Sequence, residues 1–398
     1  MDRRHFLQSS LGSVLAASAI DAHGKKPDRP PILVAVELSG GNDGLNTVVP
    51  YGDDAYYRQR PSLGIAASDL FRLDDHFGLN PGLLGLHRLW QKGQLAIVHG
   101  CGYDNPSYSH FTSMAYWHTG APNRGDALGW MGRLADEMAP QRQDNMLINI
   151  GSSQSLAVRS AVHTPLVFND PARFQRSRWL PDQAAPTDAF GYKAATKVPS
   201  GAMPNPARSF LHDVHSSAQS SAREIRGAWQ SFKTPVDYGI APMDLPKVTA
   251  CIQAGLPTQL YYVAFQNNAF DTHVNQPALH TRLLSYASDG IYGFIKDLER
   301  IGQADRVLVM VFSEFGRRVA ENANLGTDHG TANVMFLAGA GVQGGHYGRP
   351  PSLTELVDGG NLRHTVDFRQ VYATAMQSWM GIEATGILRQ SFTPLPVL

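Results

Sequence analysis

The sequence has few cysteines and no excess of either charge. Its 398 residues include only two cysteines, Cys101 and Cys251. Two thiols alone make a poor metal site, and their positions in the sequence leave open whether they approach closely enough to pair. Lys and Arg total 34, as do Asp and Glu. This balance gives no support to a polyanion-binding surface and argues against nucleic acid as a partner.

A long hydrophobic run is also lacking at the N-terminus. Residues 2–22 read DRRHFLQSSLGSVLAASAIDA, in which Arg3 and Arg4 precede a weakly apolar run. That run is too short and too rich in Ser and Gly for a stable membrane span. Twin arginines before such a run are typical of signals that export folded proteins. We expect residues 1–22 to be a twin-arginine signal peptide and the mature protein to be periplasmic or secreted. A retained N-terminal helix or anchor is the alternative.

What the chain does contain is a set of apolar runs that alternate with helix-like segments. The runs cover residues 32–38, 94–102, 259–273, 306–316 and 333–341. Between them, segments such as HTRLLSYASDGIYGFIKDLERIG carry apolar residues at helical spacing. This alternation predicts an α/β fold with a mostly parallel central sheet and helices on both faces. In such folds ligands bind beyond the carboxyl ends of the strands.

One stretch interrupts this rhythm. Residues from about 166 to 250 are rich in Ala, Ser, Gln and Pro. We interpret them as an inserted, cap-like segment within a single α/β domain that spans residues 30–398. A proline-rich linker, GKKPDRPP, separates that domain from the expected signal.

Polar side chains with metal-binding or catalytic chemistry lie at the strand ends. They are Asn42 and Asp43 after the first run, Ser109 and His110 after the second, Asp271, His273 and His280 after the third, Glu314 after the fourth, and Asp328 and His329 before the fifth. Carboxylates and imidazoles are ligands for zinc, manganese and similar ions. If the strands are parallel neighbours, these groups gather at one edge, where one or two ions could polarise a phosphate or sulfate ester.

Each motif alone also has a plain structural interpretation. The GGNDG stretch can be a tight turn, and Ser109 can be a helix N-cap. Glu314 can pair with Arg317 or Arg318. The joint placement of these groups, rather than any single motif, favours a site.

The motifs LSGGNDGLN, SHFTSMAYWHTG, SEFGRR, GTDHGTAN and HTVDFRQVYATAMQSWMG together resemble the exported bacterial family called domain of unknown function 1501. The resemblance runs from about residue 32 to the C-terminus. It implies the alkaline phosphatase-like superfamily, which includes sulfatases, with a two-metal site at the strand ends.

The resemblance also assigns roles to residues of this chain. It implies that Ser109 is the nucleophile and that the metal ligands are Asp43, Asp271, His273, Glu314, Asp328 and His329. Asn42, His110, His280 and Arg317 are supporting or alternative members of the site. The chain departs from the superfamily pattern at Glu314, where an Asp is expected, and at Phe315, where a metal-binding His is expected.

Three functions follow as hypotheses. The first is an exported hydrolase of phosphate or sulfate esters, dependent on zinc, manganese or calcium, with a small-molecule or polymer-linked ester as substrate. The second is a non-catalytic binding protein on the same fold, with a cell-envelope partner, which the substitution at Phe315 favours. The third is a metal-free serine esterase of the SGNH type, because GGND resembles the block that supplies an oxyanion-hole Asn. The nucleophile block of that type is missing.

Overall fold

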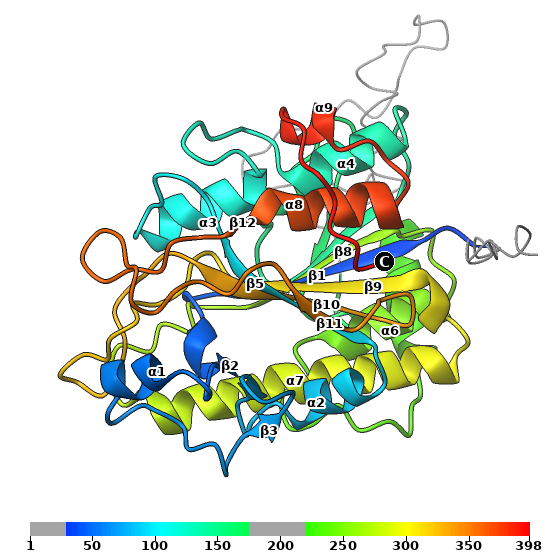
Figure 1. Ribbon diagram of the computed structural model, residues 1–398. Coiled ribbons are helices and arrows are strands. Elements are labelled where there is room, and N and C mark those ends of the chain that lie inside the picture. The colour runs from blue at the N-terminus through cyan, green and yellow to red at the C-terminus, as the bar shows by residue number, and fades with distance from the viewer. Residues whose placement is uncertain (1–28, 175–219) are drawn as a thin grey trace, which may run out of the picture. The chain divides into compact units, whose positions relative to one another are not determined.

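The structure is a computed structural model that describes residues 29–174 and 220–398. The expected signal peptide, residues 1–22, lies outside the described residues, as does the part of the expected insertion at 175–219. From Pro31 onward the chain forms one compact unit. Within this unit a central sheet lies between two layers of helices (Figure 1).

Nine strands of the described chain form the central sheet. Eight follow in the order β11-β5-β10-β9-β1-β8-β6-β7, and β12 also pairs with β5. Their bounds are β1 Ile32–Leu38, β5 Leu95–Gly102, β6 Leu147–Ile150, β7 Leu166–Phe168, β8 Leu260–Phe265, β9 Val307–Phe312, β10 Asn333–Ala338, β11 Gly345–Tyr347 and β12 Val366–Asp367. Each of the five apolar runs therefore contains a strand of this sheet.

The sheet is mostly parallel, as expected, with β10 as the exception. β1 runs parallel to both β8 and β9, whereas β10 runs antiparallel to β5 and β9. Residues that precede a strand lie at the edge opposite to residues that follow its parallel neighbours. Because β10 is reversed, its start lies at the same edge as the ends of β1, β8 and β9. That reversal brings the segment before β10 to the edge where ligands bind.

Alternate residues of β1 pack against different helix layers. Val34 and Val36 belong to one hydrophobic core, and Leu33 and Ala35 belong to another. The first core is covered by α2 (Leu84–Gln91), α6 (Leu245–Gln253) and α7 (Gln276–Arg300). The second is covered by α3 (His110–Thr119), α4 (Trp130–Met138), α8 (Phe368–Ala373) and α9 (Thr385–Leu388). Burial on both faces explains why the strands are continuous apolar runs.

A smaller antiparallel sheet follows β1 in the chain, with strands in the order β2-β4-β3. Its strands are β2 Val48–Val49, β3 Phe71–Arg72 and β4 Gly78–Leu79. Further elements are α1 (Asp54–Gln59), the short turns η1 (Gly44–Asn46), η2 (Leu156–Val158) and η3 (Ala304–Arg306), and the π-helical η4 (Thr374–Trp379). Residues 220–231 are helical too. In Figure 1 this sheet lies on the same side of the central sheet as α2 and α7.

The two cysteines are free, buried thiols. Cys101 packs in the core under α3, and Cys251 packs in the core on the other side of the sheet. The sheet therefore lies between them, and they form no disulfide.

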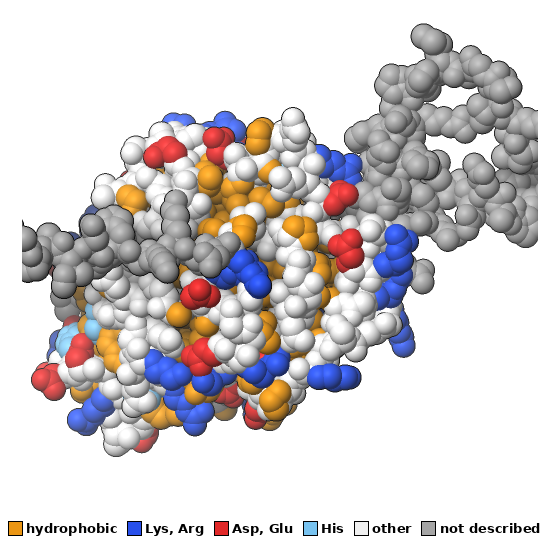
Figure 2. Space-filling model, turned by 90° about the vertical axis from the view of Figure 1, so that its right-hand side faces the viewer, with side chains coloured by type: hydrophobic (Ala, Val, Ile, Leu, Met, Phe, Trp, Pro, Cys, Tyr) orange, Lys and Arg blue, Asp and Glu red, His pale blue; other side chains and the backbone are white. Residues whose placement is uncertain are grey.

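No helix within residues 29–174 and 220–398 has the length and apolar character needed to cross a membrane. Figure 2 shows one face of the molecule, on which Lys and Arg side chains are interspersed with Asp and Glu. On that face, charges of one sign do not gather into a broad patch. This arrangement matches the balanced charge of the sequence.

Candidate metal centre

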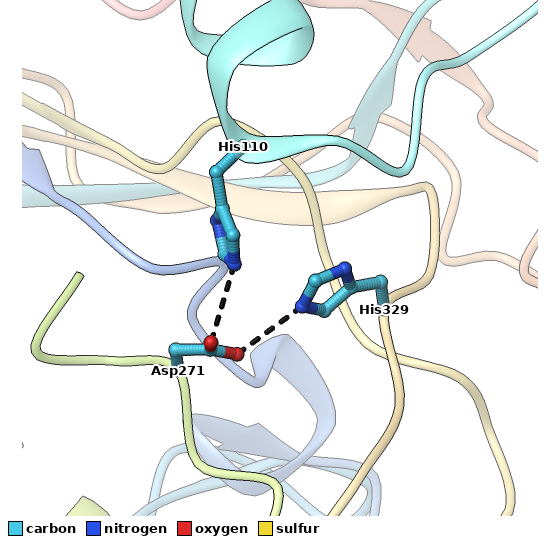
Figure 3. A group of neighbouring side chains, drawn as sticks. All are labelled: His110, Asp271 and His329. Carbon is cyan, nitrogen blue, oxygen red and sulfur yellow. Dashed lines mark hydrogen bonds and ion pairs between the residues drawn. The ribbon is translucent and has the colours of Figure 1, made fainter.

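Three side chains from distant parts of the sequence point toward one another at the carboxyl edge of the sheet (Figure 3). His110 begins α3, Asp271 follows β8, and His329 precedes β10. One ligand atom from each lies within 4.8 Å of the others. His110 Nε2 is 3.3 Å from Asp271 Oδ2, and His329 Nε2 is 3.2 Å from Asp271 Oδ1. Two imidazole nitrogens and a carboxylate oxygen form a donor set that suits zinc or manganese.

A buried carboxylate orients His110. Its Nδ1 lies 2.7 Å from Oε1 of Glu314, a fully buried residue that also accepts hydrogen bonds from the Gly40 amide at 2.9 and 3.1 Å. Burial opposes the charged form of the imidazole, but the hydrogen bond to Glu314 and its charge outweigh this and raise the pKa of His110 above 6.5. Glu314 therefore supports a ligand from behind, an arrangement common at metal sites.

The other ring nitrogen of His110 is the best sign that the centre has room for an ion. Nε2 is buried and makes no hydrogen bond within the described chain, although the Asp271 carboxylate lies 3.3 Å away. A buried polar atom without a partner carries a desolvation cost. A cation between these atoms would satisfy His110 Nε2 and the carboxylate together.

Arg317 holds Asp271 in place. This arginine is fully buried and lies 2.7 Å from Asp271 Oδ1, and it also donates to the Gly41 carbonyl at 2.6 Å and the Thr327 carbonyl at 2.8 Å. Burial raises the pKa of Asp271, but the hydrogen bond and charge of Arg317 outweigh it, so the pKa lies below 3.8. The carboxylate is therefore ionised at neutral pH, as a metal ligand must be.

The tautomer of His329 is fixed by a backbone contact. Its Nδ1 lies 2.8 Å from the carbonyl oxygen of Tyr108, which can only accept, so Nδ1 carries the proton. This leaves Nε2 as a lone pair that faces the centre. Burial lowers the pKa of His329 below 6.5, which keeps the ring neutral.

His273 and Asp328 lie at the outer side of the same centre. His273 Nε2 is 2.9 Å from His329 Nε2 and 3.0 Å from Asp271 Oδ1. Asp328 Oδ1 lies 3.5 Å from His273 Nδ1 and accepts from the Asn322 amide at 3.1 Å. His273 can thus supply a fourth donor atom, a third nitrogen, and Asp328 lies behind it.

Asp43 lies apart from this group and is fully engaged elsewhere. It is completely buried, forms an ion pair of 2.6 Å with Arg60, and accepts from the Gln276 amide at 2.5 Å. Its side chain also accepts from the amides of Leu45 and Asn46 at the start of η1. Burial raises the pKa of Asp43, yet the charge and hydrogen bond of Arg60 outweigh it and bring it below 3.8.

Asn42 and His280 form a second buried pair beside Asp43. His280 Nε2 lies 2.9 Å from Asn42 Oδ1, and the Asn42 amide donates to Thr47 Oγ1 at 2.9 Å. Burial lowers the pKa of His280 to about 4, so the ring is neutral. These contacts engage both ends of the Asn42 side chain.

Ser109 occupies the N-cap position of α3, directly before His110, and its hydroxyl makes no capping hydrogen bond. The residue is exposed. Its neighbours Tyr108 and Phe111 are exposed too, with Phe111 at 89%. This hydroxyl is exposed next to His110, a candidate ligand.

Phe315 forms a hydrocarbon wall of the centre. Its ring is 4.9 Å from the His110 ring and 4.8 Å from the His329 ring, and it is 1% exposed. A Cβ on Gly41, which has a φ of 69°, would lie 2.1 Å from the Phe315 ring. The glycine therefore permits the ring to close this side, where the resemblance implied another ligand.

The resemblance implied a supporting or alternative role for His110, whereas the structure places it among the converging ligand atoms. Sequence reasoning did not name Arg60, Gln276 or Tyr108. Arg60 lies outside the GGNDG motif that contains Asp43, its ion-pair partner. Tyr108 contacts His329 through its backbone carbonyl. The sequence carries no signal for either contact.

Comparison with known proteins confirms the resemblance over part of the chain. The family model described as protein of unknown function DUF1501 matches residues 245–387. This segment contains Asp271, His273, Glu314, Asp328 and His329, and excludes Asp43 and His110. No curated protein sequence matches the chain.

Several solved structures are similar to this chain at low identity. A protein of the alkaline phosphatase superfamily from Vibrio parahaemolyticus is 9% identical, with a TM-score of 0.42 over 92% of this chain and 71% of that one. The PsFucS1 sulfatase from Pseudoalteromonas sp. is 12% identical, with a TM-score of 0.40 over 92% and 71%. The lipoteichoic acid synthase LtaP from Listeria monocytogenes is 10% identical, with a TM-score of 0.37 over 90% and 75%.

Proposed function

We propose that this chain is an exported, metal-dependent hydrolase of phosphate or sulfate esters. The observation that carries the proposal is the convergence of His110, Asp271 and His329, with a buried His110 Nε2 that has no hydrogen-bond partner in the described chain. His273 is the fourth donor in reach. Nitrogen-rich donor sets favour zinc or manganese over calcium.

A bound divalent ion would polarise the ester and lower the pKa of an attacking oxygen. The residues of the chain orient and protect this centre. Glu314 and the Tyr108 carbonyl fix the two imidazoles, and Arg317 keeps the carboxylate ionised. Ser109, at the positive end of α3, would form a bond to the phosphorus or sulfur atom as the bond to the ester alcohol breaks. The alcohol would leave with the serine proton, and water would then release phosphate or sulfate and restore the hydroxyl. Free backbone amides at the helix start favour the anion.

Calcium and a second ion receive less support from the donor set. Calcium prefers oxygen ligands. Glu314 and Asp43 are engaged by protein donors, and Phe315 lines the wall. We therefore propose one ion, held by His110, Asp271, His329 and His273, with Asp328 behind His273.

One observation favours a second candidate, the non-catalytic binding protein. Phe315 replaces a ligand-type side chain with hydrocarbon in direct contact with two of the imidazoles. In that case the centre would hold an ion as a structural or binding element. A cell-envelope partner and export through residues 1–22 belong to either proposal.

Two variants test the proposal on the mature protein, exported through its own signal. His329→Ala should lose the bound ion, whereas Ser109→Ala should keep it and lose ester turnover. His364→Ala, at a partly buried histidine near Asp104, is the matched control and should change neither. Elemental analysis and a panel of aryl phosphates and sulfates give the two readouts. Metal binding without turnover on any ester would support the binding protein, and a metal-free wild-type protein would contradict both.

A further inference from the structure

Arg318 is a charged residue beside the candidate metal centre whose side chain the protein leaves unpaired. Within residues 29–174 and 220–398 its guanidinium group makes no hydrogen bond and no ion pair. The residue is partly buried, and its Nε is fully buried without an acceptor. A buried N–H without an acceptor carries a desolvation cost, which is larger for a charged group. An anion from solution would offset this cost.

The neighbouring Arg317 is the opposite case. It is 1% exposed, and its guanidinium donates to Asp271 Oδ1 at 2.7 Å and to the carbonyls of Gly41 and Thr327 at 2.6 and 2.8 Å. The two arginines are adjacent and carry the same charge, yet the protein supplies acceptors for only one of them. Arg317 is the counter-charge of Asp271, whereas the charge of Arg318 has no such use within the described chain.

Backbone pairing places Arg318 next to the centre. Arg317 and His329 form an antiparallel bridge, and the Arg318 amide donates to the Asp328 carbonyl at 3.0 Å. Successive side chains of an extended segment point to opposite sides, and Arg317 points to Asp271. Arg318 therefore does not share the position of Arg317 behind Asp271. An anion at Arg318 would be a different group from the ester held at the centre.

The charge of Arg318 acts on two residues that each contact an imidazole of the centre, Asp328 and Tyr108. A hydrogen bond from Asn322 is the main reason that the pKa of Asp328 lies below 3.8, and the charge of Arg318 adds to it. Burial raises the pKa of Tyr108, and the charge of Arg318 opposes this rise. Both effects place the guanidinium group near the outer side of the centre.

The nearby carboxylates do not neutralise Arg318. Asp328 accepts a hydrogen bond from the Asn322 amide at 3.1 Å. Asp358 is exposed, and after burial its charge is a cause of the raised pKa of Tyr108. Neither carboxylate forms an ion pair with Arg318 in the described part of the chain. The charge is therefore available to a ligand.

We propose that Arg318 binds a second anionic group of the ester substrate, beside the group that is hydrolysed. The planar fork of N–H donors in a guanidinium group fits the oxygens of carboxylate, phosphate and sulfate groups. The inference rests on the proposed ester hydrolysis and narrows its substrate to polyanions, such as a polymer with anionic groups on neighbouring units.

Binding of alkanesulfonates tests the second anionic group without any turnover. Propanesulfonate has one anionic group and propane-1,3-disulfonate has two, and longer homologues extend the spacing between them. The mature protein, loaded with zinc, is titrated with each compound by calorimetry at low salt, where charge interactions are least screened. The best-spaced disulfonate should bind about tenfold more tightly than its monosulfonate, the worth of one charge-assisted hydrogen bond.

Three variants identify the group that recognises the second anion. Arg318→Gln should abolish the preference for the disulfonate, and the fold loses no side-chain contact within the described residues. Arg318→Lys keeps the charge without the fork and should retain part of the preference. Arg88→Gln removes the same charge from an exposed position on α2. It is the matched control and should leave the preference unchanged.

Ester turnover separates this inference from the proposed hydrolysis. With phenyl phosphate and 3-carboxyphenyl phosphate as substrates, Arg318→Gln should lower kcat/KM about tenfold for the carboxylated ester alone. If no ester is hydrolysed but the disulfonate preference depends on Arg318, the hydrolysis is wrong and the anion site stands. Equal binding of mono- and disulfonates to wild type, or no binding of either, would overturn the inference even where turnover is found. A preference that persists in Arg318→Gln would overturn it too.

Discussion

The molecule has two clusters of histidine and aspartate, and they differ in geometry more than in composition. In the first, atoms of His110, Asp271 and His329 converge within 4.8 Å. In the second, Asp74, His346 and His99 are joined end to end. Converging lone pairs repel one another and favour a cation, whereas in the second cluster the two imidazoles pair directly with each other. The same residue types therefore support metal binding in one place and hydrogen bonding in the other.

The surroundings reinforce this difference. Buried charges, those of Glu314 and Arg317, lie directly behind the first cluster. The second is packed between Phe77 and Trp90. Phe315 also lines the first cluster, so the buried charges, which tune the ionisation of neighbouring groups, are what set it apart. Counting ligand-type residues alone would have treated the two clusters alike.

The largest expected effect is a loss of stability on substitution of Asp43, which lies outside the first cluster. Asp43→Asn leaves the buried Arg60 without its ion-pair partner, which should lower the free energy of unfolding by about 3–5 kcal/mol. Because Asp43 lies outside the converging group, the protein should keep its bound metal. Chemical denaturation and elemental analysis give the two numbers.

The double variant Asp43→Asn/Arg60→Met is the control for this experiment. It removes both charges and should recover part of the lost stability. Loss of metal in Asp43→Asn, with stability unchanged, would mean that Asp43 is a ligand after all, as the resemblance implied.

The next effect concerns the metal itself. Asp271→Asn removes the only carboxylate of the converging group and should weaken zinc or manganese binding by at least about 100-fold. Asp74→Asn makes the same change in the linear cluster and should leave the affinity as it was. Metal titration of the two variants side by side decides the comparison. Equal affinities would show that geometry does not distinguish the clusters.

The fold could be predicted from the sequence because strands that are buried on both faces are continuous apolar runs. Continuous apolar runs matched β1 at Ile32–Leu38 and contained β9 at Val307–Phe312. The direction of each strand could not be predicted, because an apolar run has the same pattern whether its neighbours are parallel or antiparallel. β10 is antiparallel, and only this makes residues before it meet residues that follow β8.

The candidate site was accessible to a lesser degree. Asp271 and His329 follow from strand ends and motifs. His110 became a ligand candidate because Glu314 turns its ring, and such an orientation depends on a contact between residues far apart in sequence. For His99 and His346 the sequence offers no pattern, since they meet only through the pairing of β5 with β11.

A smaller effect tests the neutral state of the linear cluster. The pKa of His99 is lowered from 6.5 to about 3 in the folded state, so the unfolded chain takes up this proton first. The resulting stability is complete above pH 6.5 and is lost as the pH falls toward 3. Between pH 6.5 and 5.5 this residue should cost about 1 kcal/mol of unfolding free energy. His99→Phe should show a flatter pH dependence than wild type.

The smallest expected effect on stability is that of replacing Phe111, which is next to His110 of the first cluster. Phe77 is buried against the linear cluster, whereas Phe111, next to His110, is 89% exposed. Phe111→Ser removes no packed contact and should change the unfolding free energy by no more than about 0.5 kcal/mol. Metal affinity should stay the same, because the ring supplies no ligand atom. A loss above about 1 kcal/mol in thermal or chemical denaturation would show that Phe111 packs against the protein.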